Sequence, residues 1–125
     1  MKTFTQRVTD AYMEAIDFTE TPMFEDVAGI CGAEFHGYST DMNDEAVRQV
    51  SDFLDYLTRT GLMDEVVERL SAEQIGHDFW LTRNHHGAGF WDRGLEALGE
   101  RLTAAAQTFG DGDVYLGDDG WVHFA

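Results

Sequence analysis

The chain of 125 residues is long enough to form one domain with a sizeable core, and its 43% of hydrophobic residues exclude disorder along the whole chain. Its 24 acidic residues against 8 basic ones give a formal net charge of −16, and the acidic excess runs through both halves of the sequence. This charge makes nucleic acid and anionic membranes poor direct partners, and it makes basic proteins the electrostatically favoured ones.

The start of the chain and its single cysteine predict a soluble protein of the cytoplasm. The first ten residues, MKTFTQRVTD, do not have the apolar run of a signal peptide, and no later run approaches the length of a membrane span. Cys31 is the one cysteine, which excludes an intrachain disulfide and fits a reducing compartment. We expect its side chain to be a small, buried apolar group.

An amphipathic helix and an irregular connection are predicted for the first 40 residues. Apolar residues recur at the helical period over residues 3–18, namely Phe4, Val8, Tyr12 and Ile16. Pro22 has no backbone N–H, so we expect it to help end this helix. Residues 21–40 contain three glycines and no long period, which predicts an irregular connection with at most one short strand.

Two helices are predicted between residues 41 and 70. The first begins near Asp41, ends before Gly61, and has an apolar face made of Val47, Val50, Leu54 and Leu57. It also has oppositely charged residues four positions apart, namely Arg48 with Asp52 and Asp55 with Arg59. A shorter helix follows, and we expect it to bury Leu62, Met63, Val66, Val67 and Leu70.

Two more helices and a hairpin are predicted from residue 71 onward. Ser71 and Gln74 have the spacing of a capping box, and the helix that follows should stop at Gly87 and Gly89. The last helix has the most regular apolar spacing and should end at Gly110, with its stripe made of Trp91, Leu95, Leu98, Leu102, Ala105 and Phe109. In the tail, DVYLGDDGWVHF, two β-type runs flank the letters GDDG, which predicts a hairpin.

Together these elements predict a single globular domain over residues 1–125. No internal repeat, low-complexity run or linker divides the chain. The expected fold class is mainly α (α+β): a compact helical domain of about five helices with a C-terminal β-hairpin.

The segment HDFWLTRNHHGAGFWDRG, residues 77–94, gathers the residue types of a candidate site. A small metal-dependent hydrolase could use its three histidines as ligands, namely His77, His85 and His86. The spacing argues against this alternative, because no His-x-x-x-His pair is present and His77 and Asp78 would point to different faces of a helix. We therefore expect no metal, no cofactor and no catalytic residue, while the hydrolase stays open as an alternative.

The same segment is better explained as a corner between two helices. Trp80, Phe90 and Trp91 would form an aromatic cluster across the corner. Arg83 and Arg93 would then pair with Asp78, with Asp92 or with the acidic hairpin tip. An accessory protein that docks a partner through the exposed part of this corner is an alternative function, with Trp80, Arg83, Phe90 and Trp91 as its binding residues.

Two rows of carboxylates, spaced three or four residues apart, form the favoured binding surface. They consist of Asp10, Glu14 and Asp17 in the first helix and of Asp92, Glu96 and Glu100 in the last. Such a row places carboxylates about 6 Å apart along a helix and is unfavourable in isolation. Two rows lying side by side would imitate the phosphates of a DNA backbone. An ordinary solvated helix face, or the acidity of a high-GC genome or a salt-adapted host, remains an open alternative.

Residues 77–94, taken with GDDGWVHF further on, resemble a motif in small uncharacterised proteins encoded by bacteriophages and mobile elements. The resemblance covers about residues 71–124. That family has no assigned activity, so the resemblance implies a genomic setting and no catalytic residues. With the acidity, it predicts a non-enzymatic phage-type protein that binds a basic host protein in the host cytoplasm. The favoured form is a DNA-mimic inhibitor of a CRISPR or restriction defence, or of another DNA-handling enzyme.

Overall fold

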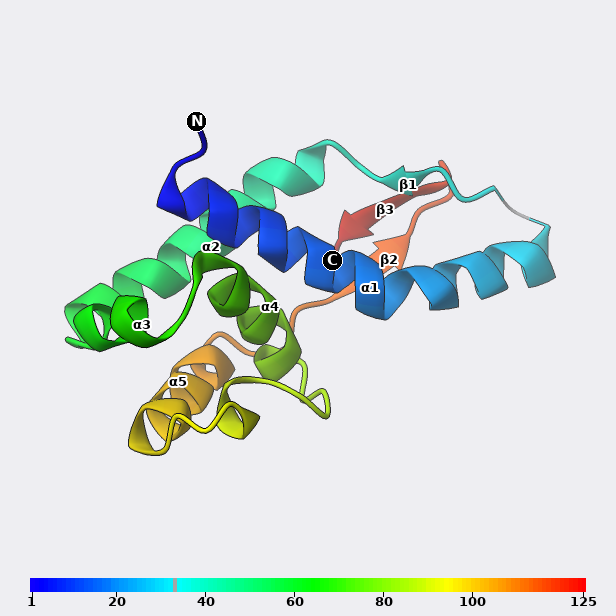
Figure 1. Cartoon of the computed structure of the whole chain (residues 1–125). Coiled ribbons are helices and arrows are strands. Elements are labelled where there is room, and N and C mark those ends of the chain that lie inside the picture. Colours follow the sequence, from blue (N-terminus) through cyan, green and yellow to red (C-terminus); the bar gives the residue numbers. More distant parts are fainter. Residues whose placement is uncertain (33) are drawn as a thin grey trace.

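Five α-helices, one short 3₁₀ helix and a three-stranded sheet make up the described part of the chain (Figure 1). The structure is a computed structural model that describes residues 1–32 and 34–125, without the side chain of Cys31. The expected burial of Cys31 therefore lies outside the described part. The elements are α1 (Phe4–Cys31), β1 (Gly37–Tyr38), α2 (Asp41–Arg59), α3 (Met63–Arg69), α4 (Ala72–Arg83), η1 (Phe90–Asp92), α5 (Ala97–Thr108), β2 (Val114–Leu116) and β3 (Trp121–Phe124). This architecture confirms the expected mainly helical fold with a C-terminal hairpin.

Helix α1 is longer than predicted, because it continues through Pro22 to Cys31. A proline inside a helix removes one backbone hydrogen bond and is unfavourable by itself. Tertiary packing offsets that loss: Phe24 is buried, and its ring lies 6.4 Å from that of Phe35. The hydroxyls of Thr21 and Tyr38 are also 2.7 Å apart. The prediction of an irregular connection from residue 21 was therefore wrong as far as the end of α1.

The sheet lies beside the second half of α1 and is built around the predicted hairpin (Figure 1). Strands β2 and β3 pair antiparallel, with Val114 opposite Phe124 and Leu116 opposite Val122. The turn between them has Gly120 at a φ of 83°, which a glycine adopts without strain. Strand β1 pairs parallel with the other edge of β3, so the sheet joins the connection after α1 to the end of the chain.

The core lies where α4 packs against α1, α2 and α5. Gly76 allows α1 and α4 to approach closely, since a Cβ at this position would overlap the carbonyl oxygen of Val8 and lie 2.8 Å from the Cβ of Ala11. Phe79, on the same helix, stacks on Phe53 of α2 with ring centroids 4.0 Å apart. This packing places the C-terminal half of α4, where the 77–94 segment begins, in the centre of the protein.

The last predicted helix is interrupted, and this corrects the expectation of one helix from Trp91 to Phe109. Residues 90–92 form the 3₁₀ helix η1, and α5 begins only at Ala97. Gly94 and Glu96 between them have φ values of 70° and 59°, which are incompatible with a continuous α-helix. The break lets Phe90 turn into the core, where it is fully buried beside Phe53.

Smaller expectations for α2 and α3 were also wrong. Arg48 donates a hydrogen bond to Glu45 at 2.6 Å, and neither predicted i,i+4 pair is among the ion pairs of the described residues. Val67 is exposed, because α3 turns only one edge toward the core. The capping box of Ser71 and Gln74 at the start of α4 is confirmed, with the Gln74 N–H donating to the Ser71 hydroxyl at 3.1 Å.

Candidate functional site

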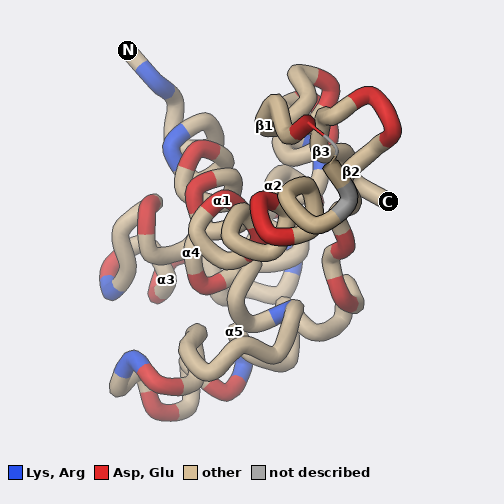
Figure 2. Tube along the Cα trace, turned by 90° about the vertical axis from the view of Figure 1, so that its right-hand side faces the viewer, with Lys and Arg blue, Asp and Glu red and all other residues tan. Residues whose placement is uncertain are grey.

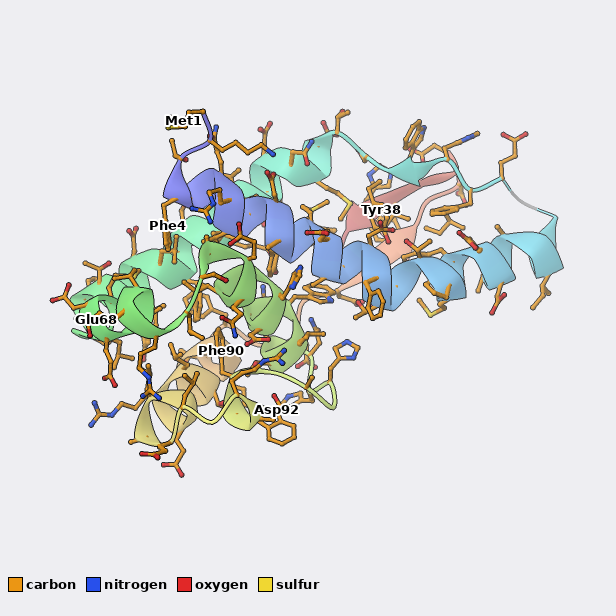
Figure 3. The ribbon with its side chains drawn as sticks, in the orientation of Figure 1. Met1, Phe4, Tyr38, Glu68, Phe90 and Asp92 are labelled. Atoms are coloured by element: carbon orange, nitrogen blue, oxygen red, sulfur yellow. The ribbon has the colours of Figure 1, made fainter. Side chains whose placement is uncertain are left out.

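The 77–94 segment forms the second half of α4, a loop and η1, and most of its polar side chains bond inside the protein. In Figure 3, Phe90 lies between α4 and α5, whereas Asp92 lies at the outer edge of the same corner. Asp78, Thr82 and Arg83 are buried polar residues. What each of them contacts decides which part of the segment remains available to a partner.

Arg83 is only 7% exposed, and within the described residues its guanidinium hydrogen-bonds to neutral oxygens. Its guanidinium donates hydrogen bonds of 2.8 to 3.1 Å to the carbonyls of Phe109 and Gly110, the hydroxyl of Tyr12 and the amide oxygen of Gln49. The two carbonyls lie just beyond the C-terminus of α5, where the helix dipole favours a positive charge. The expected pairing of Arg83 with an acidic side chain was therefore wrong.

Asp78 and Arg93 form a two-pronged ion pair, one of the pairings that the sequence suggested. The Arg93 Nε and Nη2 atoms donate to the two Asp78 carboxylate oxygens at 3.1 and 2.8 Å. Asp78 is fully buried, and its hydrogen bonds raise the pKa of Arg93 above the usual range for arginine. The charge of Arg93 is thus offset by Asp78 and adds little to the surface potential.

Three other side chains of the segment hydrogen-bond to groups outside α4. The indole N–H of Trp80 donates to the hydroxyl of Thr19 at 3.0 Å. The Thr82 hydroxyl accepts from the backbone N–H of Phe90 at 3.1 Å, and the Asn84 amide oxygen accepts from that of Gly112 at 2.9 Å. These hydrogen bonds hold the corner together. They also occupy the polar groups of the three side chains, which are then not available to a ligand.

Most of the predicted aromatic corner is buried. Trp80 and Phe90 are fully buried, with Trp80 packed edge-on against Tyr12 and Phe90 stacked on Phe53. Trp91 alone among the four candidates is well exposed, at 56%. In this structure a partner at the corner would meet Trp91 but neither Trp80 nor Phe90.

The three histidines of the segment contact different parts of the protein. The Nε2 atom of His77 is 3.6 Å from the Glu14 carboxylate on α1, and that of His85 is 3.4 Å from the Asp111 carboxylate. His86 lines a groove between α1 and the end of α4. Within the described part of the chain, no group of three or more His, Cys, Asp or Glu side chains could hold a metal ion.

The acidic row predicted on the first helix is present on α1. Asp10, Glu14 and Asp17 are exposed at i, i+4 and i+7, and they lie among the acidic positions that Figure 2 shows along α1. Lys2 pairs with Asp10, while the Glu14 side chain is 73% exposed. Asp17 accepts a hydrogen bond from the Thr21 hydroxyl, and His77 lies 3.6 Å from Glu14, but all three carboxylates are exposed to solvent.

The second predicted row does not form on one helix. Asp92 lies in η1 and accepts a hydrogen bond from the Gly89 N–H at 3.1 Å, Glu96 precedes α5, and Glu100 lies in its first turn. Figure 2 shows acidic positions along α2, at the hairpin end and before α5 as well as on α1. The negative charge is therefore spread over the molecule, and the α1 row is one of its regular helical parts.

A groove of about 460 Å³ lies beside this row, between α1 and the end of α4. Its lining is largely apolar and comes from α1, α4 and the loop before η1, in particular Ala15, Phe18, Leu81 and Ala88. The side chains of Glu14, His77, His86 and Arg93 also reach it. Phe18 is 85% exposed, which is unusual for a phenylalanine.

Sequence reasoning missed Phe18, although a signal was present. Phe18 does not belong to the stripe of Val8, Tyr12 and Ile16 that packs α1 into the core. An aromatic residue outside the core-facing stripe of an amphipathic helix is a candidate for a contact with a partner.

No family model matches the chain, and no curated protein or solved structure matches it. None of the helices in the described residues is long and apolar enough to cross a membrane. The functional assignment therefore depends on the exposed carboxylates and the groove of this chain itself.

Proposed function

We propose that this protein is a non-catalytic binding protein whose α1 carboxylates bind a basic surface of another protein, in place of nucleic-acid phosphates. The observation that carries the proposal is the exposed row of Asp10, Glu14 and Asp17 at helical spacing, with Glu14 73% exposed. Like charges at this spacing disfavour an isolated helix by a few tenths of a kcal/mol per pair, and a basic partner would relieve that repulsion.

The large acidic excess of the surface supports this proposal, and two of the arginines are bound inside the protein. Arg93 is bound by Asp78, and Arg83 is enclosed among neutral oxygens. Arg83 and Asp78 are both buried and have opposite charges, so the accessible surface keeps an acidic excess equal to the formal net charge of −16. Such a surface attracts cationic proteins over a long range at low ionic strength.

The spacing of the row limits how closely it can imitate DNA. Three carboxylates over seven residues of helix give one charge per about 5 Å, which is sparser than the roughly 3.4 Å between phosphates of one strand. Because the second acidic row is interrupted, only the α1 row remains. It would take the place of a few phosphates of one DNA strand. A partner that contacts a short stretch of backbone through a few arginines or lysines fits this geometry better than one that encloses a whole duplex.

The resemblance of residues 77–94 to phage-encoded proteins suggests where such a partner should be sought. Enzymes that cut or bind nucleic acid in a bacterial host, including CRISPR and restriction nucleases, present basic grooves to phosphates. The proposal is that the α1 row occupies such a groove and inhibits the enzyme by competing with its nucleic acid.

The test is competition with DNA for purified CRISPR nuclease complexes and restriction endonucleases at low and moderate salt. The variant Asp10→Asn/Glu14→Gln/Asp17→Asn should lose inhibition. The matched control, Asp52→Asn/Asp55→Asn/Glu68→Gln, removes three exposed carboxylates from α2 and α3 and should keep most of it. Loss of inhibition to the same extent in both variants would show that only total charge matters, and no inhibition across the panel would contradict the proposal.

A further inference from the structure

We infer that the groove between α1 and the α4–η1 corner binds an apolar side chain of the basic partner, carried on a helical segment between lysines or arginines. This inference rests on the proposed function, because it assigns a second contact to the same basic partner. The recognised segment of the partner would present one apolar residue with cationic neighbours.

The shape and lining of the groove fit an apolar side chain. Phe18, Leu81 and Ala88 provide apolar walls from α1, α4 and the loop, and the volume of about 460 Å³ exceeds that of one large side chain. Phe18 is 85% exposed and lies outside the core stripe of α1, so the packing of the fold does not account for it. Aromatic residues exposed beside a pocket are typical of protein-binding sites.

The charges around the groove favour cationic residues next to the apolar one. Glu14 reaches the groove and is the i−4 neighbour of Phe18 on α1, so its carboxylate and the phenyl ring adjoin on the same helix face. Asp17 and Asp10 continue the acidic row from there. Arg93 is the one arginine of the lining, and Asp78 already offsets its charge.

The same charge argues against a second copy of this chain as the occupant. Two molecules of net charge −16 repel each other, and α1 would bring two acidic rows together. A helical segment of opposite charge lying along α1 would instead place its apolar residue in the groove and its lysines or arginines against Glu14 and Asp17. Helix-in-groove recognition of this kind uses one or a few apolar contacts for position and charge for attraction.

Two synthetic helical peptides test the inference: a lysine–alanine peptide with one central leucine, and the same peptide with alanine at that position. Their affinities for the folded protein should differ by about three- to tenfold in favour of leucine, since an open groove buries only part of a leucine side chain. In an NMR titration, the leucine peptide should shift the amide signals of Phe18, Leu81 and Ala88 more than the alanine peptide does.

Substitution of Phe18 provides the decisive comparison. Phe18→Ser should abolish the difference between the two peptides, whereas Val67→Ser, which removes an exposed apolar residue from α3, should leave it intact. Both residues are exposed, so each variant should keep the fold, and circular dichroism checks that it does.

The outcomes separate this inference from the proposed function. Met23, Val27 and Ile30 are exposed apolar residues farther along α1. If both peptides bind through the α1 row but leucine gives no advantage, or if the leucine peptide shifts the signals of these three residues instead, the groove inference is overturned and the proposed function stands. If the binding of neither peptide depends on Asp10, Glu14 and Asp17, the proposed function is overturned as well.

Discussion

The hydroxyl of Tyr12 lies between a guanidinium and an amide oxygen inside the protein. It accepts a hydrogen bond from Arg83 Nη1 at 2.8 Å and donates one to Gln49 Oε1 at 2.5 Å. Burial raises the pKa of Tyr12 to about 12, although the nearby Arg83 acts in the opposite direction. The neutral hydroxyl therefore takes part in holding α1, α2 and α4 together.

This pKa predicts a loss of stability in alkaline solution. The unfolded chain releases the Tyr12 proton near pH 10, before the folded protein does, so stability from this group is complete below about pH 10 and is lost as the pH rises through about 12. The total loss should be about 2–3 kcal/mol, measured as the free energy of unfolding in urea at increasing pH.

Tyr12→Phe should make that pH dependence shallower, and Tyr115→Phe, at an exposed position, should not. Burial also raises the pKa of Tyr38, which adds a slope of the same sign in every variant. An unchanged slope in Tyr12→Phe would show that the folded protein does not hold this hydroxyl neutral.

At the scale of elements, the crossing of α1 and α4 depends on the missing side chain at Gly76. Gly76→Ala should destabilise the protein by about 1–3 kcal/mol, because the added methyl group overlaps the backbone of α1 and separates the two helices. The melting temperature is the measurement.

Gly29→Ala is the matched control for this substitution. Gly29 lies in α1 with no atom near its Cβ position and no positive φ, so alanine there should stabilise the helix by about 0.5–1 kcal/mol. We expect Gly76→Ala to lower the melting temperature and Gly29→Ala to raise it. A neutral Gly76→Ala would mean that the helices can move apart without loss.

The elements that could be predicted from the sequence are those whose signals lie within a few neighbouring residues. The capping box of Ser71 and Gln74 starts α4, and the letters GDDG join β2 to β3. The signal at Pro22 was also local but pointed the wrong way, because the packing of Phe24 on Phe35 outweighs the missing hydrogen bond. A contact between residues on different elements leaves no pattern within a short stretch of sequence, so it could not be predicted in this way.

At the scale of the whole molecule, the acidic excess should make stability depend on salt. Carboxylates spread over many elements repel one another, and salt screens this repulsion over about 30 Å at 0.01 M but only about 8 Å at 0.15 M. Raising sodium chloride between these concentrations should stabilise the fold by about 1 kcal/mol, or roughly 4 °C in Tm.

The triple variant Asp52→Asn/Asp55→Asn/Glu68→Gln should show a smaller rise in Tm with salt, because it carries fewer negative charges. A Tm that stays flat or falls as salt increases would indicate that ion pairs such as Arg7 with Glu73 outweigh the general repulsion.

The candidate site was only partly predictable for the same reason as the fold. The α1 row follows from the period of one helix, and it is present as expected. The second row required a helix through Gly94 and Glu96, which the burial of Phe90 interrupts. The groove combines Phe18, Leu81 and Ala88 from three separate segments, so no spacing in the sequence could reveal it.

By itself, the sequence determined the acidic charge, most of the helices and the hairpin, since composition, period and turn residues act over short distances along the chain. Tertiary structure alone decided which polar groups turn inward. Arg83 and Asp78 are as polar as any surface residue, yet they are buried because partners from α1, α2 and the segments that follow α5 and η1 meet them there. Burial of a charge depends on the bonds that compensate it, and those bonds exist only after the helices have packed.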